Sequence, residues 1–293
     1  MICKKLKAAT KSASVKRYTR GESIKALTYF FISVAYNILK NTSENIMAKK
    51  YVILDTETTG TNEEDRVIQL GYIVLGAKDI EVHNEFCTTD VAIKFGAMEV
   101  HGITPDLLEG KSTCKQTEAY KRLLELNTEE NYLIIHNAPF DITMLEKEGF
   151  STQMKVIDTL RVAKHVLPDE EAHRLQYFRY KMELYKEEEK EAEALGVVVK
   201  AHDAIGDVLV LKLFLSKLKD IVQEQFPNEN PVEKMVDLTN TPILIKTFRF
   251  GKHKGKSLEE VAREDAGYLR WMLKNMENID EDMRYSINYY LES

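Results

Sequence analysis

The sequence has few features of a disulfide scaffold, a zinc centre or a membrane protein. Only three of its 293 residues are cysteine, an odd number without C-x-x-C spacing, so neither a disulfide framework nor a cysteine-rich zinc site is expected. No run reaches the ~18–20 continuous apolar residues that a membrane-spanning helix needs. We therefore expect a cytoplasmic protein without a membrane partner, long enough for one large and one small domain.

The chain after its first segment carries a net negative charge. The net charge is −6, but residues 1–46 hold nine Lys/Arg against two Asp/Glu, which leaves −13 for the remainder. A net negative charge over the remainder of the chain does not indicate nucleic-acid binding. Any contact with nucleic acid must therefore be local or assisted by metal ions. Apolar residues within 1–46 recur at helical spacing, without a clean signal-cleavage site. A membrane-surface helix and a true start at Met47 both stay open.

Composition divides the chain into four segments. After the basic, amphipathic extension 1–46, we expect a large domain at 47–220, a linker rich in Pro and Asn at 221–242, and a module at 243–293. The linker has room for one short helix. The charge-rich run near residues 183–194 is interpreted as a solvated helical face.

The large domain shows alternating strand and helix patterns. Strands are expected at residues 51–54, 67–75, 80–88, 132–135 and 155–157, the first three as an antiparallel meander. Helices are expected at 112–127, from about residue 140, and over most of the remainder to residue 220. These patterns predict an α/β fold with a mixed β-sheet flanked by helices.

Two acidic residues follow the first apolar strand in the string DTETTG, residues 55–60. Side chains two apart in an extended segment point to the same face, so Asp55 and Glu57 are expected to project together. Two carboxylates this close repel each other unless a cation lies between them. Alone, the pattern is common on protein surfaces.

Two further strings place acidic residues near helix starts. In HNAPFD, residues 136–141, Pro139 suits a first helical turn that would contain Asp141, although a helix-capping role is the simpler interpretation. In HDAIGD, residues 202–207, His202 precedes a long apolar helix and Asp207 lies about a turn inside it. Spacing alone does not separate Asp207 from Asp203.

Four carboxylates and one histidine form an oxygen-rich set of the kind that binds Mg²⁺ or Mn²⁺. Two such ions about 4 Å apart are a common arrangement for phosphodiester hydrolysis. A histidine that titrates near neutral pH is suited to accept a proton from the attacking water.

The three strings resemble the motifs of the DEDDh family of 3′→5′ exonucleases, over about residues 50–218. This resemblance implies a ribonuclease H-like fold and two Mg²⁺ ions, which Mn²⁺ can replace, bound by Asp55, Glu57, Asp141 and Asp207. It makes His202 the general base, and the family pattern H-x-A-x-x-D favours Asp207 over Asp203.

The resemblance also implies contacts with the substrate. The string HGIT, residues 101–104, is similar to a family segment beside the terminal nucleotides, although a plain turn is the alternative. The implied substrate-binding residues are Thr56, Thr58, His101, Ile103, Asn137 and Phe140. Asp158 resembles a residue with a supporting rather than catalytic role.

The module at 243–293 is expected to have an α+β structure. An aromatic strand through Phe248 and Phe250 leads into a glycine-flanked loop with Lys252, Lys254 and Lys256. This loop is one residue short of a P-loop and no Rossmann-like unit precedes it, so nucleotide-triphosphate hydrolysis is rejected. The lysines are interpreted as phosphate contacts, with a solvated turn as an equal alternative. Tyr268 and Trp271, on the following helix, are assigned to a small core.

The strings FGKHKGK and GYLRW resemble the C-terminal extension of exodeoxyribonuclease X enzymes, which implies DNA 3′ ends as the substrate. We expect release of 5′-mononucleotides in DNA repair or end processing. The alternatives are an exoribonuclease of RNA maturation or decay, a polymerase-associated proofreading subunit, for which the sequence shows no specific sign, and a non-catalytic DNA-binding module.

Overall fold

The computed structural model describes residues 49–77, 79–197 and 204–292, all within the unit Lys49–Ser293. The predictions for residues 1–46 and for a start at Met47 lie outside the described residues. No helix in the described ranges is both long and apolar enough to cross a membrane.

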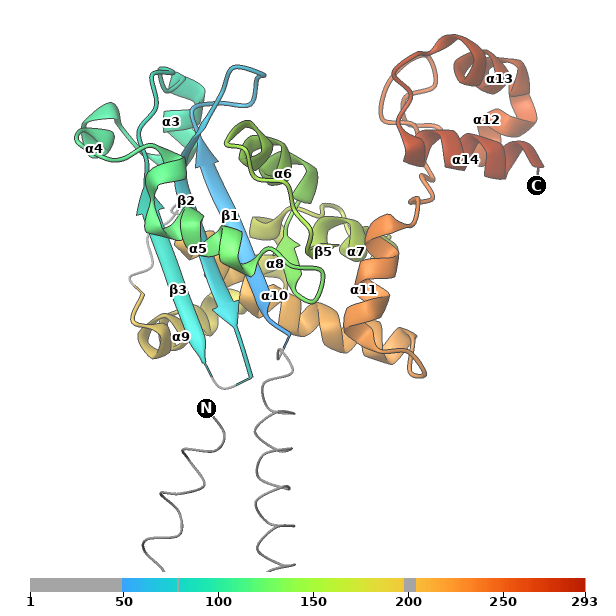
Figure 1. The fold of residues 1–293 in the computed structure, drawn as a ribbon. Helices are drawn as coiled ribbons and strands as arrows, with labels where there is room; N and C mark the ends of the chain where they lie inside the picture. The colour runs from blue at the N-terminus through green and yellow to red at the C-terminus, as the bar shows by residue number, and fades with distance from the viewer. Residues whose placement is uncertain (1–48, 78, 198–203, 293) are drawn as a thin grey trace, which may run out of the picture. The chain divides into compact units, whose positions relative to one another are not determined.

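The element order is mixed, with a three-stranded start followed by alternating helices and strands (Figure 1). The strands are β1 (Tyr51–Thr58), β2 (Val67–Leu75), β3 (Ile80–Phe86), β4 (Tyr132–Ile135) and β5 (Lys155–Asp158). The helices up to residue 197 are α3 (Phe95–His101), α4 (Pro105–Leu108), η1 (Cys114–Gln116), α5 (Glu118–Leu126), α6 (Ala138–Lys147), α7 (Thr159–Val166), α8 (Leu175–Lys181), η2 (Leu184–Lys186) and α9 (Glu188–Leu195). The helices from residue 204 onward are α10 (Ala204–Gln225), α11 (Pro231–Asn240), α12 (Leu258–Glu264), α13 (Ala266–Asn275) and α14 (Glu281–Glu292).

The five strands form one mixed sheet in the order β3-β2-β1-β4-β5. β1 pairs antiparallel with β2 and parallel with β4, and β2 and β3 complete the predicted meander. This confirms the predicted fold class of the large domain. β1 is longer than predicted, because its pairing with β2 continues to Thr58, so Asp55 and Glu57 lie within the strand and not after it.

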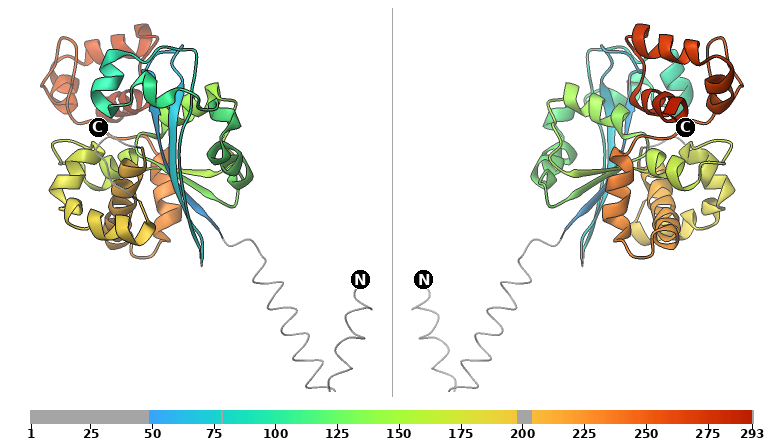
Figure 2. Two further views of the ribbon diagram at one scale, coloured as in Figure 1. Left: turned by 90° about the vertical axis from the view of Figure 1, so that its left-hand side faces the viewer. Right: turned by 90° about the vertical axis from the view of Figure 1, so that its right-hand side faces the viewer.

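Helices cover both faces of the sheet, as Figure 2 shows in views close to the sheet edge. Alternate residues of β1 divide between the two cores, since successive side chains of a strand point to opposite faces. Ile53 packs in a cluster with apolar residues of α7, α8, α10 and α11. Val52 and Leu54 pack in a second cluster with residues of α5 and α6. The first cluster fixes α10, which carries Asp207, against the sheet.

The segment predicted as a linker is largely helical. α10 continues to Gln225, and α11 begins after Asn230, whose side chain accepts hydrogen bonds from the amides of Val232 and Glu233. Pro231 takes the first helical position, where its missing N–H costs nothing. The domain boundaries themselves stay predictions.

The C-terminal module is helical, and the predicted aromatic strand is wrong. In this part of the described chain the only pairing is one isolated bridge between Thr247 and Ser257. Gly251 and Gly255, both at positive φ, bend the chain between them. Phe248 is buried in the core of α12, α13 and α14, whereas Phe250 is 43% exposed.

The charge-rich run at 183–194 is not simply a solvated face. Glu188 is buried, and its two carboxylate oxygens accept hydrogen bonds from the guanidinium of Arg179, both at 2.6 Å. Such a paired arrangement offsets the cost of burying the charge. The run therefore helps to fasten α9 to α8.

Candidate active site

Asp55 and Glu57 point from the same face of β1, as their spacing predicts. They stand opposite Gly71 and Gln69 of β2, and the register between the two strands shifts immediately after Glu57. Such bulges reorient the side chains beside them and are common next to functional sites. Thr56, between the two acids, points to the opposite face.

Asp207 reaches these two residues from the first turn of α10. The close packing of α10 on the sheet depends on Gly71, directly opposite Asp55. A Cβ at Gly71 would lie 2.9 Å from the Cβ of Ala204 and 3.0 Å from the amide nitrogen of Ile205. Gly71 is not recognisable from the sequence alone, because a lone glycine in a strand does not reveal which helix approaches it.

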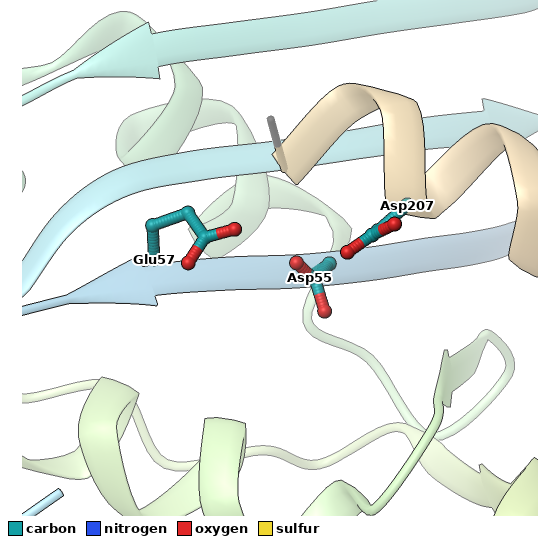
Figure 3. Close-up of side chains that lie close together, drawn as sticks. All are labelled: Asp55, Glu57 and Asp207. Atoms are coloured by element: carbon teal, nitrogen blue, oxygen red, sulfur yellow. The ribbon is translucent and has the colours of Figure 1, made fainter. Parts of the chain in front are cut away.

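The three carboxylates converge (Figure 3). One oxygen from each of Asp55, Glu57 and Asp207 lies within 4.8 Å of the other two. Burial raises the pKa of Asp55 well above its usual range. The negative charges of Asp141, Asp207 and Glu57 raise it further. A protonated Asp55 or a bound cation relieves this repulsion.

Asp141 lies in the first turn of α6, and its charge acts on Asp55. It is 3% exposed, and its Oδ1 accepts hydrogen bonds from the amide of Thr56 at 2.9 Å and from its hydroxyl at 2.7 Å. Burial raises the pKa of Asp141 to about 7, although the two bonds from Thr56 favour the charged form. Asp141 is thus anchored to β1 through Thr56, close enough for its charge to raise the pKa of Asp55, but outside the group of three.

Two glutamines that were not predicted as site residues support the cluster. Gln176 of α8 donates a hydrogen bond to Oδ1 of Asp207 at 2.7 Å. Gln69, fully buried in β2, accepts a hydrogen bond from the amide of Ala204 at the start of α10, at 3.4 Å. Both contacts join residues far apart in sequence, so no local sequence pattern predicts them.

The predicted general base, His202, lies outside the described residues, as does its neighbour Asp203. The role of His202 therefore stays a prediction. The first described residue after it, Ala204, is buried against the sheet beside Gly71.

Several predicted substrate-binding side chains make internal hydrogen bonds. Thr58 donates to the carbonyl of Gly60 at 2.7 Å. The buried ring of His101 lies 3.2 Å from the carbonyl of Thr58 through Nε2, while Nδ1 accepts from the amide of Ile103 at 2.9 Å. Burial lowers the pKa of His101, so the neutral ring fastens α3 to the end of β1.

The loop before α6 is exposed at its tip. Asn137 has a positive φ of 73° and an exposed side chain, and Phe140 is half-buried. The carboxylate of Asp158 accepts a hydrogen bond from the amide of Asn137 at 3.0 Å and caps α7. This agrees with the supporting role expected of Asp158.

The lysines of the C-terminal loop differ in their surroundings. Lys252 pairs with Asp265, and Lys256 pairs with Glu260 and Glu264. Lys254 is exposed and has no ion pair within the described ranges. The assignment of Trp271 to a small core is wrong, because its side chain is 53% exposed.

The donor set of the cluster fits a hard divalent cation. Carboxylate oxygens are the preferred ligands of such ions, and the converging geometry concentrates negative charge at one point. Neither of the two cysteines in the described ranges contributes, since Cys87 and Cys114 are free and buried in the core around α5 and α6.

Comparison with known proteins places this site in a family. A family model described as Exonuclease matches residues 52–215, and one described as Exodeoxyribonuclease X-like C-terminal matches residues 248–277. Exodeoxyribonuclease 10 of Escherichia coli (strain K12) is 26% identical over 82% of this chain and 98% of its own length. A PolC-type DNA polymerase III of Bacillus cereus is 28% identical over 67% of this chain and 13% of its own length.

A solved structure described as exonuclease X in complex with 5′ overhanging duplex DNA superposes with a TM-score of 0.47 and 18% identity, over 65% of this chain and 99% of that one. The resemblance noted in both parts of the sequence is confirmed by the two family models. Since the exonuclease model spans more than half of the sequence and includes Asp55, Glu57 and Asp207, the chain belongs to the exonuclease family and has its ribonuclease H-like fold.

Proposed function

We propose that the protein is a metal-dependent 3′→5′ exodeoxyribonuclease that releases 5′-mononucleotides from DNA ends. The observation that carries this proposal is the convergence of Asp55, Glu57 and Asp207 in a domain of the exonuclease family. DNA is favoured as the substrate because a relative named exodeoxyribonuclease is similar over 82% of this chain, and because the C-terminal module matches the Exodeoxyribonuclease X-like C-terminal family.

In this proposal Asp55, Glu57, Asp141 and Asp207 hold two Mg²⁺ ions, which Mn²⁺ can replace. When bound, such ions supply positive charge for attack on the phosphodiester and for departure of the 3′-oxygen. Thr56 orients Asp141 through its amide and hydroxyl, and Gln176 orients Asp207. His202 is the base that removes the proton of the attacking water.

The contacts with the 3′-terminal nucleotide belong to the same proposal. Asn137 and Phe140 flank the start of α6, which carries Asp141, and their side chains are at least partly accessible. The segment with His101 and Ile103 is fixed beside the end of β1 by the hydrogen bond to Thr58. Thr56 and Thr58 contribute by holding the strand end, and Lys252, Lys254 and Lys256 by lying near the phosphates.

The free thiols of Cys87 and Cys114 suit a reducing compartment. We therefore assign the proposed activity to the cytoplasm.

The decisive assay uses single-stranded DNA, duplex DNA and RNA, each labelled at the 5′ or the 3′ end, with Mg²⁺ or with EDTA. The proposal expects a ladder of shortened 5′-labelled DNA, immediate release of the 3′ label as a mononucleotide, and no reaction in EDTA. Preferential digestion of RNA would replace DNA with RNA as the substrate. Shortening from the 5′ end would contradict the proposal.

A further inference from the structure

The C-terminal module presents an aromatic pair to solvent. Trp271, the only tryptophan of the chain, is 53% exposed on α13. Its ring stacks on that of Tyr268, with 6.0 Å between the centroids and 21° between the planes. Tyr268 itself packs against the module's core, so the pair is anchored on one side and open on the other.

A basic loop contacts Tyr268 of this pair. Residues 246–256 contain five Lys/Arg and no Asp/Glu. The ammonium of Lys252 lies 5.6 Å from the centre of the Tyr268 ring. The ring of His253 packs edge-on against the Tyr268 ring, with 4.9 Å between the ring centroids. A Cβ at Gly251 would lie 3.0 Å from the hydroxyl of Tyr268, so glycine permits the close approach of the loop.

Much of the positive charge of the loop is already paired. Asp265 pairs with Lys252 and lies 3.1 Å from the ring of His253, while Lys256 pairs with two glutamates. Arg249 and Lys254 are exposed and make no ion pair within the described part of the chain. Two available charges give only a modest attraction to a polyanion, so a nucleic-acid ligand would need a second source of affinity.

Base stacking supplies that source. An exposed aromatic ring gains about 1–3 kcal/mol from each base that stacks on it, whatever the base, and basic groups beside it hold the backbone. Only unpaired bases offer a free face to such a ring. An exposed Trp stacked on Tyr, beside a loop with free cationic groups, therefore fits single-stranded nucleic acid better than duplex.

We propose that Trp271 and Tyr268 form a base-stacking platform that holds single-stranded DNA, with Arg249 and Lys254 on its phosphates. This inference rests on the proposed function for the choice of DNA as ligand. The platform provides a second binding site for the DNA strand, separate from the carboxylate cluster. Its consequence is a preference for substrates with unpaired bases.

Because Trp271 is the sole tryptophan, its fluorescence reports on the platform directly. The full chain is titrated in EDTA with oligodeoxythymidylate, with an abasic oligomer of the same length and with blunt duplex DNA. The proposal expects saturable quenching by oligodeoxythymidylate and little by the other two. Absence of quenching, or equal quenching by the abasic oligomer, would overturn it. The titration measures binding and not turnover, so its outcome is independent of the exonuclease assay.

A variant series separates stacking from general damage. Trp271→Ala is expected to weaken binding of single-stranded DNA about tenfold, measured by fluorescence anisotropy of a labelled oligomer, whereas Trp271→Phe should retain most of the affinity. Tyr185→Ala is the matched control, since Tyr185 is an aromatic residue of similar exposure, 44%, in η2. Unchanged affinity of a folded Trp271→Ala protein would refute the platform and leave the surface to a protein partner.

Discussion

Gly71 of β2 stands opposite Asp55 of β1, and a Cβ at Gly71 would lie 2.9 Å from the Cβ of Ala204. The missing side chain lets the first turn of α10 rest on the sheet, and that turn delivers Asp207 to Asp55 and Glu57. The acidic cluster therefore depends on a residue that has no functional group.

Gly71→Ala tests this dependence. The added methyl group would push α10 outward, and overpacking of this kind costs about 1–3 kcal/mol. We expect exonuclease activity to fall at least about tenfold while the fold persists, as checked by circular dichroism and urea unfolding. Gly96→Ala is the control, because nothing lies within 4 Å of a Cβ there. Full activity of Gly71→Ala would show that the acidic cluster does not depend on a glycine at this position.

Thr56 and Asp141 provide a test of electrostatics. Thr56→Val deletes the hydroxyl that donates to Asp141 at 2.7 Å, and Thr56→Ser keeps it. A hydrogen bond to a charged group contributes about 1.5–3 kcal/mol, and its loss raises the pKa of Asp141 further above its ordinary value. We expect the acid limb of the kcat/KM profile to move upward by about one pH unit in Thr56→Val only. Superimposable profiles for the two variants would count against this coupling.

Gln176 is expected to set the affinity for metal through Asp207. Gln176→Met removes the donor that lies 2.7 Å from Asp207 while keeping the length of the side chain. Loss of such a supporting contact typically costs about 10–100-fold in metal affinity or activity, so the Mg²⁺ concentration for half-maximal activity should rise about tenfold or more. Gln223→Met, on the exposed part of α10, should change nothing. Equal Mg²⁺ curves for both variants would refute the role of Gln176.

His136 predicts a pH dependence of stability. Its Nε2 lies 2.8 Å from the carbonyl of His173, and burial lowers its pKa to about 4 from the ordinary 6.5. Between these values the unfolded chain binds a proton that the folded chain does not, so stability falls as pH drops through 6.5 toward 4. We expect about 2 kcal/mol of this loss between pH 7 and pH 5, measured by urea unfolding in EDTA.

His136→Gln should flatten that part of the pH curve, because it removes the titrating ring. Its stability at pH 7 will also change, so the comparison is between slopes. A variant that loses as much stability as the parent between pH 7 and pH 5 would show that other groups are responsible.

Local patterns predicted much of the sheet. The bounds of β2 and β4 agree with the prediction, because continuous apolar, β-prone runs bounded by turn signals specify buried strands. The common orientation of Asp55 and Glu57 was also predictable, since residues two apart in a strand share a face. α11 is the short helix for which the predicted linker has room, and Asn230 and Pro231 form its regular start.

Other features depend on contacts that no local pattern encodes. The link from Gln176 to Asp207 and the approach of Ala204 to Gly71 arise only when distant segments pack together. The prediction that Trp271 lies in a small core is wrong. Its place on the exposed side follows from which face α12 and α14 cover, which spacing alone does not specify.

The central claim is that the cluster of Asp55, Glu57 and Asp207 binds the divalent metal of a 3′→5′ exonuclease. The most direct measurement is calorimetric titration of Mn²⁺ into the full chain and into its Asp207→Asn variant, with both assayed on 5′-labelled single-stranded DNA. The account predicts Mn²⁺ binding by the parent, at least about tenfold weaker binding by the variant, and loss of most activity in parallel. Unchanged Mn²⁺ affinity together with unchanged activity in Asp207→Asn would contradict it.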